Sequence, residues 1–155
     1  MKKIVFVAAV LLLSFTAVPS FAETVSADDV SVYLLKRWVS EKYGCKIDDD
    51  GDLILNKDGG KIFVTVKKKQ KMVRIFSIFG AYEKRSINEM IKLANRFNDK
   101  KIFLRVSINP ESGSSWCDHY IVYNGGLNSK NFIETVDWFI ALEKSWNDFV
   151  VNNGD

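Results

Sequence analysis

Apolar side chains recur along this chain at two spacings, one typical of helices and one typical of strands. Spacings of three and four positions predict amphipathic helices over residues 28–43, 86–98 and 128–150. Ser86 with Glu89 three residues later is a capping box, in which each side chain satisfies a free backbone N–H at the start of the helix.

Alternation of apolar and polar residues predicts strands between these helices. An Asp-Gly pair separates the short apolar runs at 45–47 and 53–55, which indicates a hairpin. Longer alternating segments are residues 62–67, 73–79, 102–108 and 116–123. The expected order is α-β-β-β-α-β-β-α, with strands in hairpins and helices apart from them. This order predicts an α+β fold with an antiparallel sheet and helices packed on it.

The first 22 residues predict a secretory signal peptide. Two lysines give a basic start, an apolar stretch follows from Ile4 to Val18, and Ser20 and Ala22 supply the small residues of a cleavage site. The alternative is a retained membrane anchor, but a membrane span needs about 20 apolar residues. We expect cleavage after Ala22 and a periplasmic or secreted protein.

Removal of residues 1–22 leaves residues 23–155, a normal size for one domain. No repeat or linker divides this segment, and its first residues, 23–27, are expected to be a flexible lead. The chain has 22 Lys and Arg against 19 Asp and Glu, and without Lys2 and Lys3 the balance is 20 to 19. Such a domain attracts nucleic acid and anionic lipid weakly. We expect no nucleic-acid partner and no integral membrane segment after cleavage.

Cys45 and Cys117 are the two cysteines of the chain. Thiols tend to pair in an oxidising compartment. A bridge between them would close a loop of roughly 70 residues, worth about 4 kcal/mol in the chain-entropy model. The alternative is that both are small buried apolar residues without a bond.

The arrangement of certain residues carries a family resemblance. These residues are Tyr43-Gly44-Cys45 after the first helix, the turn Asp49-Asp50-Gly51, the helix end at 93–98, and Gly125-Gly126-Leu127 before a helix with Trp138 and Phe139. Over roughly Ala27 to Phe149 the chain resembles the YbjN family, whose fold is similar to that of type III secretion chaperones. The resemblance implies a non-enzymatic domain with a role in stress response or regulation. Secretion chaperones dimerise and bind extended segments of other proteins, so it also implies a protein or peptide partner and allows a homodimer. The predicted signal peptide sets this chain apart from the secretion chaperones, because an exported protein does not act in the cytoplasm.

Cys117 and His119 are the one place where a nucleophile and an imidazole meet. Residues two apart in a strand share a face, and a Cys–His pair can form a reactive thiolate. No oxyanion hole or nucleophile turn accompanies them. A structural zinc site needs four ligands, which one histidine and two distant cysteines do not supply. Residues 46–57 fail as an EF-hand, because Lys46 and Lys57 occupy the first and last ligand positions. We expect no metal, cofactor or catalytic residue.

Two further features concern binding. Lysines 67–69 and 71 with Arg74 form a basic run that can bind acidic groups or can simply be a solvated turn. Aromatic residues occupy both faces of the predicted strands, and one face must lie away from the helices. Four of them are the candidate interaction surface: Phe76, Phe103, Trp116 and Tyr120. Irregular alternation at twists and bulges is the other interpretation of this pattern.

The sequence therefore favours an exported YbjN-like domain that binds a protein or peptide. Two alternatives stay open. One is a carrier of a small ligand or lipid in a cavity lined by Phe and Trp, and the other is a thiol-dependent enzyme using Cys117 and His119.

Overall fold

The structure is a computed structural model, and it describes residues 22–57 and 60–152. The predicted signal peptide therefore lies outside the described residues, apart from Ala22. Residues 58–59 and the last three residues also lie outside them.

Eight strands, three α-helices and one 3₁₀ turn follow one another in the described residues. They are β1 Thr24–Val25, α1 Val32–Val39, β2 Gly44–Ile47, β3 Leu53–Lys57, β4 Gly60–Lys67, η1 Lys68–Gln70, β5 Met72–Phe79, α2 Ile87–Asn98, β6 Arg105–Ile108, β7 Ser115–Val122, β8 Leu127–Asn128 and α3 Ser129–Asn152.

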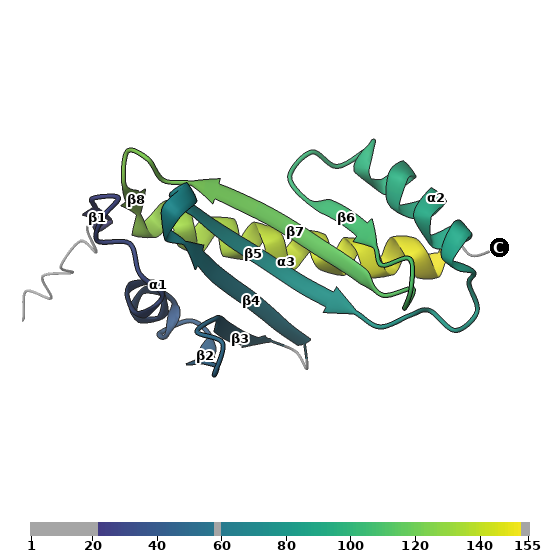
Figure 1. The fold of residues 1–155 in the computed structure, drawn as a ribbon, viewed down its shortest axis with the longest axis horizontal. Coiled ribbons are helices and arrows are strands. Elements are labelled where there is room, and N and C mark those ends of the chain that lie inside the picture. The colour runs from purple at the N-terminus through teal and green to yellow at the C-terminus, as the bar shows by residue number, and fades with distance from the viewer. Residues whose placement is uncertain (1–21, 58–59, 153–155) are drawn as a thin grey trace, which may run out of the picture.

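Six strands form one antiparallel sheet in the order β2-β3-β4-β5-β7-β6, and β1 pairs with β8 separately. Figure 1 shows the long helix α3 running along one face of this sheet, behind β5 and β7. The α+β class with an antiparallel sheet and packed helices is confirmed. The order differs in two respects. Four strands and not three separate the first two helices, because the runs on both sides of the Asp-Gly turn each form a strand, and two short strands, β1 and β8, precede α1 and α3.

Capping side chains place the helix starts. In α2 the predicted capping box is present, with the Ser86 side chain accepting from the Glu89 N–H and Glu89 accepting from the Ser86 N–H. In α1 the cap is Ser31, whose hydroxyl accepts from the N–H of Leu34. The helix is shorter than the predicted span of 28–43 at both ends, because it begins after Ser31 and ends at Val39, with Ser40 as its C-cap.

The hydrophobic core lies between the sheet and the helices. Strands contribute alternate residues such as Leu55, Val64 and Ile75, and all of these are completely buried. The three helices contribute Leu35 and Val39, Met90 and Phe97, and Phe132, Val136, Phe139 and Trp146. Because each strand and each helix buries one side in this layer, the spacing of its apolar residues indicates whether a segment is a strand or a helix.

Two segments differ from expectation at the ends of elements. Residues 23–27 are not a free lead, because Thr24 and Val25 pair with Asn128 and Leu127. The predicted strand 102–108 begins only at Arg105, and Ile102 before it is fully exposed.

Of the two possibilities for Cys45 and Cys117, the structure has the unbonded one, and both thiols are free. Cys45 lies on β2 and Cys117 on β7, four strand positions apart in the sheet. At about 4.8 Å per strand this is roughly 19 Å, whereas bridged cysteines have Cα atoms within about 7 Å. The sheet order therefore excludes the intramolecular bond that the sequence allowed.

Candidate functional site: the open face of the sheet

One face of the six-stranded sheet lies away from the core. Strand register identifies it, because residues directly opposite each other share a face and alternate residues change face. We call this the open face. Its members are Gly44, Lys46, Ile54, Asn56, Lys61, Phe63, Thr65, Lys67, Met72, Arg74, Phe76, Ile78, Trp116, Asp118, Tyr120, Val122, Arg105 and Ser107. None of these eighteen residues belongs to the core cluster that the described residues form with the helices.

A single row of side chains crosses the open face with one residue from each strand. The register places Lys46 opposite Ile54, Ile54 opposite Phe63, and Phe63 opposite Phe76. The row then continues through Asp118 to Arg105. It therefore has a cation at each end and three apolar side chains after Lys46, and the carboxylate of Asp118 lies directly opposite Arg105.

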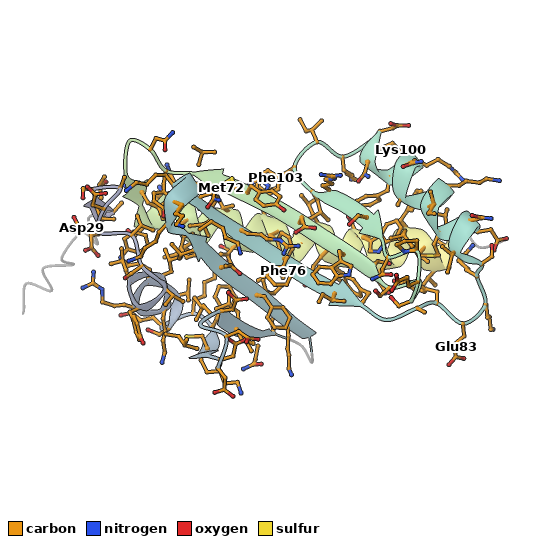
Figure 2. All side chains as sticks on the ribbon, viewed as in Figure 1. Asp29, Met72, Phe76, Glu83, Lys100 and Phe103 are labelled. Atoms are coloured by element: carbon orange, nitrogen blue, oxygen red, sulfur yellow. The ribbon has the colours of Figure 1, made fainter. Side chains whose placement is uncertain are left out.

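Aromatic stacking holds the centre of this row. The rings of Phe63 and Phe76 stack with centroids 5.0 Å apart, and those of Phe76 and Trp116 with centroids 5.8 Å apart. Figure 2 marks Phe76 near the middle of β5 and Met72 at its start. The neighbours leave Phe76 only 7% exposed although no helix lies on it. The centre is thus an ordered apolar floor.

An ion pair lies beside this floor. Arg74 and Asp118 approach to 2.5 Å, and the Asp118 side chain is only 9% exposed. The guanidinium of Arg74 also lies over the ring of Phe76, 4.2 Å from its centroid. These contacts leave little freedom to the Arg74 side chain, which becomes part of the floor.

Three large apolar side chains of the open face project into solvent. Ile78 and Tyr120 are each 44% exposed, and Val122 is 64% exposed. They are typical of a surface that a partner covers. The row and these side chains together make the open face the candidate binding site.

The free edge of β7 adjoins the open face. β6 pairs with β7 only from Ser115 to Asp118. The N–H of Tyr123 donates to the carbonyl of Lys71, so alternate residues such as Ile121 form the bonds to β5. The backbone groups of Tyr120 and Val122 point away from β5, where β6 does not reach. This short edge can accept an added strand.

The four sequence-predicted surface residues do not all lie together. Phe76, Trp116 and Tyr120 belong to the open face, but Phe103 does not. Phe103 precedes β6 and stacks on His119 on the helix side, with ring centroids 4.0 Å apart. Its placement with the other three was wrong, because it was assigned to a strand that begins two residues later.

The face also contains members that the sequence analysis did not single out. Pairing with residues on neighbouring strands places three of them on this face: Ile54, Phe63 and Asp118. The alternation of Phe63 and Phe76 with buried Val64 and Ile75 was a signal for the β4–β5 hairpin. No local signal pairs β5 with β7.

Cys117 and His119 share the helix side of β7, as the alternation predicted, but they do not form an activated pair. Cys117 is completely buried. Burial, with the carboxylate of Glu143, raises the pKa of its thiol well above the usual range. The Nδ1–H of His119 donates to the carbonyl of Phe103 at 2.7 Å, and burial lowers the pKa of this imidazole. Both effects disfavour the thiolate–imidazolium form that a nucleophile of this kind requires.

The lysines of the basic run do not all lie on the same surface. Lys67 lies on the open face, while Lys71 pairs with Asp28 and adopts a left-handed conformation after η1. The described residues contain no group of three His, Cys, Asp or Glu side chains that could hold a metal ion. Nor does any helix within residues 22–57 and 60–152 combine the length and the apolar character that crossing a bilayer requires.

Five pockets are lined by residues outside the aromatic floor, and one of them, of 340 Å³, has Phe103 and Trp138 in its lining. A pocket of 610 Å³ lies between residues 81–85 and Val150–Val151, at the C-terminal end of α3. Phe63, Phe76 and Trp116 pack against one another instead of lining a cavity. The geometry therefore gives a small-ligand or lipid carrier no support from these aromatic residues.

Comparison with known proteins identifies the same architecture elsewhere. The model of the YbjN family, described as "putative bacterial sensory transduction regulator", matches residues 27–148. The crystal structure of E. coli YbjN, described as "a putative transcription regulator", is similar with a TM-score of 0.59 and 8% identity, over 79% of this chain and 89% of that one. A chain of the HopA1–SchA chaperone–effector complex is similar with a TM-score of 0.56 and 11% identity, over 75% of this chain and 91% of that one. No curated protein matches the sequence.

Proposed function

Because the chain belongs to the YbjN family, we propose that it is an exported, non-enzymatic regulator domain that binds a protein partner through the open face of its sheet. The partner is a segment of another protein. A regulatory role for this chain is in keeping with the family description, and a chain of a chaperone–effector complex has a similar fold.

The observation that carries this proposal is the exposure of large apolar side chains on a face without a helix. Ile78, Tyr120 and Val122 project from an ordered floor of stacked rings. A rigid floor binds with a small loss of conformational entropy, because its side chains are already fixed.

Export is supported by the N-terminal pattern and by the contacts of Glu23, the first residue after the predicted cleavage site. The Glu23 carboxylate accepts from Arg37 at 2.7 and 2.8 Å and from the indole of Trp38 at 2.7 Å. Its backbone exchanges bonds with Ser129. The folded domain therefore includes the residue that would become the mature N-terminus.

The absence of catalysis is supported by the state of Cys117. A buried thiol whose pKa is raised is a poor nucleophile at neutral pH.

A photo-crosslinking residue at position 120 tests the binding surface in cells. We expect Tyr120 replaced by p-benzoylphenylalanine to crosslink to a discrete protein, and the matched replacement at Tyr33 to give none. Tyr33 is 74% exposed on α1, away from the open face. Ile78→Glu should remove the crosslink while the circular dichroism spectrum is retained.

Equal crosslinking from both positions, or none from position 120, would contradict the proposal. A product of twice the mass of the chain would identify a second copy as the partner. Mass spectrometry of the protein from fractionated cells tests export, because a chain that begins at Met1 in the cytoplasmic fraction would overturn it.

A further inference from the structure

Charge is distributed unequally between the open face and the remainder of the domain. The open face has five cations and one anion, and the cations are Lys46, Lys61, Lys67, Arg74 and Arg105. Its net charge is thus +4. The mature chain has 20 basic and 19 acidic residues, so the remaining surface has a net charge of −3. A sequence that is nearly neutral as a whole folds with one positive face.

The positions of these cations define the pattern that a partner must match. Arg74 is neutralised by Asp118 within the floor. Lys46 and Arg105 mark the two ends of the row across the sheet, while Lys61 and Lys67 are exposed on β4. The four remaining cations therefore surround an apolar centre.

The length of the row sets the length of a segment that could follow it. Six strands at about 4.8 Å separate Lys46 from Arg105 by roughly 24 Å. An extended chain advances about 3.3 Å per residue, so roughly seven residues cover the row.

The aromatic rings favour a peptide over a single-stranded nucleic acid. Nucleic-acid-binding sheets offer free ring faces on which bases stack. Here Phe76 stacks with both Phe63 and Trp116, and Arg74 lies over it. The faces of the central ring, Phe76, are thus engaged within the floor. Ring edges are electropositive, so the edges left to a ligand favour carboxylate and carbonyl oxygens.

We infer that the open face binds an extended acidic segment of a partner protein, with carboxylates near both ends of about seven residues and apolar side chains between them. This inference rests on the proposed function and specifies the class of partner. The carboxylates meet the cations at the ends of the row, and the apolar side chains cover Phe63, Phe76 and Ile78.

Defined peptides test the inference without knowledge of the natural partner. The probe is a fluorescein-labelled octapeptide, Glu-Glu-Val-Leu-Val-Leu-Glu-Glu, with blocked ends, and binding to the mature chain is measured by fluorescence anisotropy. Matched probes replace the four Glu by Gln or by Lys. We expect the Glu peptide to bind at least about tenfold more tightly than either, and its affinity to fall as NaCl is raised.

Matched variants of the protein locate the binding. Lys46→Gln/Arg105→Gln should weaken binding of the Glu peptide about tenfold. Lys92→Gln/Lys144→Gln removes the same charge from exposed positions on α2 and α3 and should leave the affinity unchanged. Thermal unfolding of both variants checks that each retains its fold.

Each other outcome overturns the inference in a distinguishable way. Equal binding of the Gln peptide would show a purely apolar site and would leave the proposed function intact. Tighter binding of a dT₁₅ oligonucleotide, weakened by the Lys46 and Arg105 substitutions, would assign the face to nucleic acid. If no probe binds but the crosslink from position 120 persists, the acidic class is wrong and a protein partner stands. If the crosslink is absent too, the proposed function itself fails.

Discussion

At the scale of the residue, Arg74 and Asp118 show how a face without a helix can still bury charge. The stacked rings of Phe76 and Trp116 shield the pair from water on a surface that register places outside the core. An ion pair in such a place orders the side chains around it more than it stabilises the fold.

Asp118→Asn should lower the free energy of unfolding by roughly 1–3 kcal/mol, because it leaves the guanidinium of Arg74 partly buried without its counter-charge. Urea denaturation measures the change, and Asp148→Asn at an exposed position of α3 is the control. The double change Arg74→Met/Asp118→Leu should recover much of the loss. Equal effects of the two Asp→Asn variants would contradict this account.

Glu143 is a second residue whose environment predicts a measurable effect, which is a dependence of the protein's stability on pH. Burial raises the pKa of its carboxyl, while the neighbouring Ser77 hydroxyl and the Lys57 ammonium oppose this. Folding therefore favours the protonated form. The stabilisation that comes from the protonated Glu143 carboxyl is complete below its ordinary pKa of 4.5 and is lost as the pH rises through the raised pKa.

Glu143→Gln should accordingly stabilise the protein at neutral pH, by roughly 1 kcal/mol. The gain should disappear as the pH approaches about 4, because the wild-type carboxyl is then protonated in both folded and unfolded chains. Melting temperatures measured across this range check the sign, with Glu134→Gln on the exposed side of α3 as the control. A gain that grows at acid pH would refute it.

At the scale of the element, β7 is asymmetric. Its N-terminal half lies between β5 and β6, while the last residues pair on one side only. The Tyr123–Lys71 bond settles which amides face β5, so the consequences of proline at neighbouring positions differ.

Val122→Pro should retain the fold, because its amide faces the free edge. Ile121→Pro should destabilise the domain by roughly 2–4 kcal/mol, because its amide bonds to Val73 on β5. Urea denaturation of the two variants makes the comparison. Similar stability of both would show that the inferred alternation is wrong.

The capping box of α2 illustrates an element that depends on local chemistry alone. Its Ser86 and Glu89 lie three residues apart, and the structure forms both bonds that this spacing allows. The start of α1 was less predictable, because Ser26, Asp28 and Ser31 are all chemically able to cap it. The structure uses Ser31, and the residue before it, Val30, belongs to the same buried core as Leu35.

At the scale of the whole molecule, the N-terminal segment joins regions that are distant in sequence. Glu23 contacts α1 through Arg37 and Trp38 and contacts the start of α3 through Ser129. β1 then pairs with β8. A chain that begins at Glu23 therefore closes one end of the domain.

A mature chain that begins at Ser26 should melt a few degrees below one that begins at Glu23, because it loses the β1–β8 pair and the Glu23 contacts. Glu23→Gln should have a smaller effect. Bonds from Trp38 and Arg37 lower the pKa of Glu23, so this effect should be present at neutral pH and vanish as the pH falls through the lowered pKa. Identical melting of all three chains would show that the N-terminal contacts are not maintained.

The candidate site was predictable only in part. Trp116 and Tyr120 could be placed on one face of β7 because alternation is a local property of a strand, whereas their alignment with Phe76 depends on the pairing of β5 with β7. Phe103 was misplaced because the start of β6 depends on the Asn98 side chain, which bonds the backbone N–H and carbonyl of Val106. The ion pair between Arg74 and Asp118 joins residues 44 positions apart and has no signature in either segment.

The sequence by itself determined the helices, most strands, the capping box and the α+β class, because these follow from periodicity and from side chains within a few residues of one another. The tertiary structure decided the strand order, and the strand order decided the rest. It separated Cys45 from Cys117 and aligned Lys46 with Arg105 across six strands. It also gathered four cations, which form no ion pair within residues 22–57 and 60–152, around a floor of stacked rings. Pairing between distant strands depends on how all the apolar faces are buried together, and no single segment contains that information.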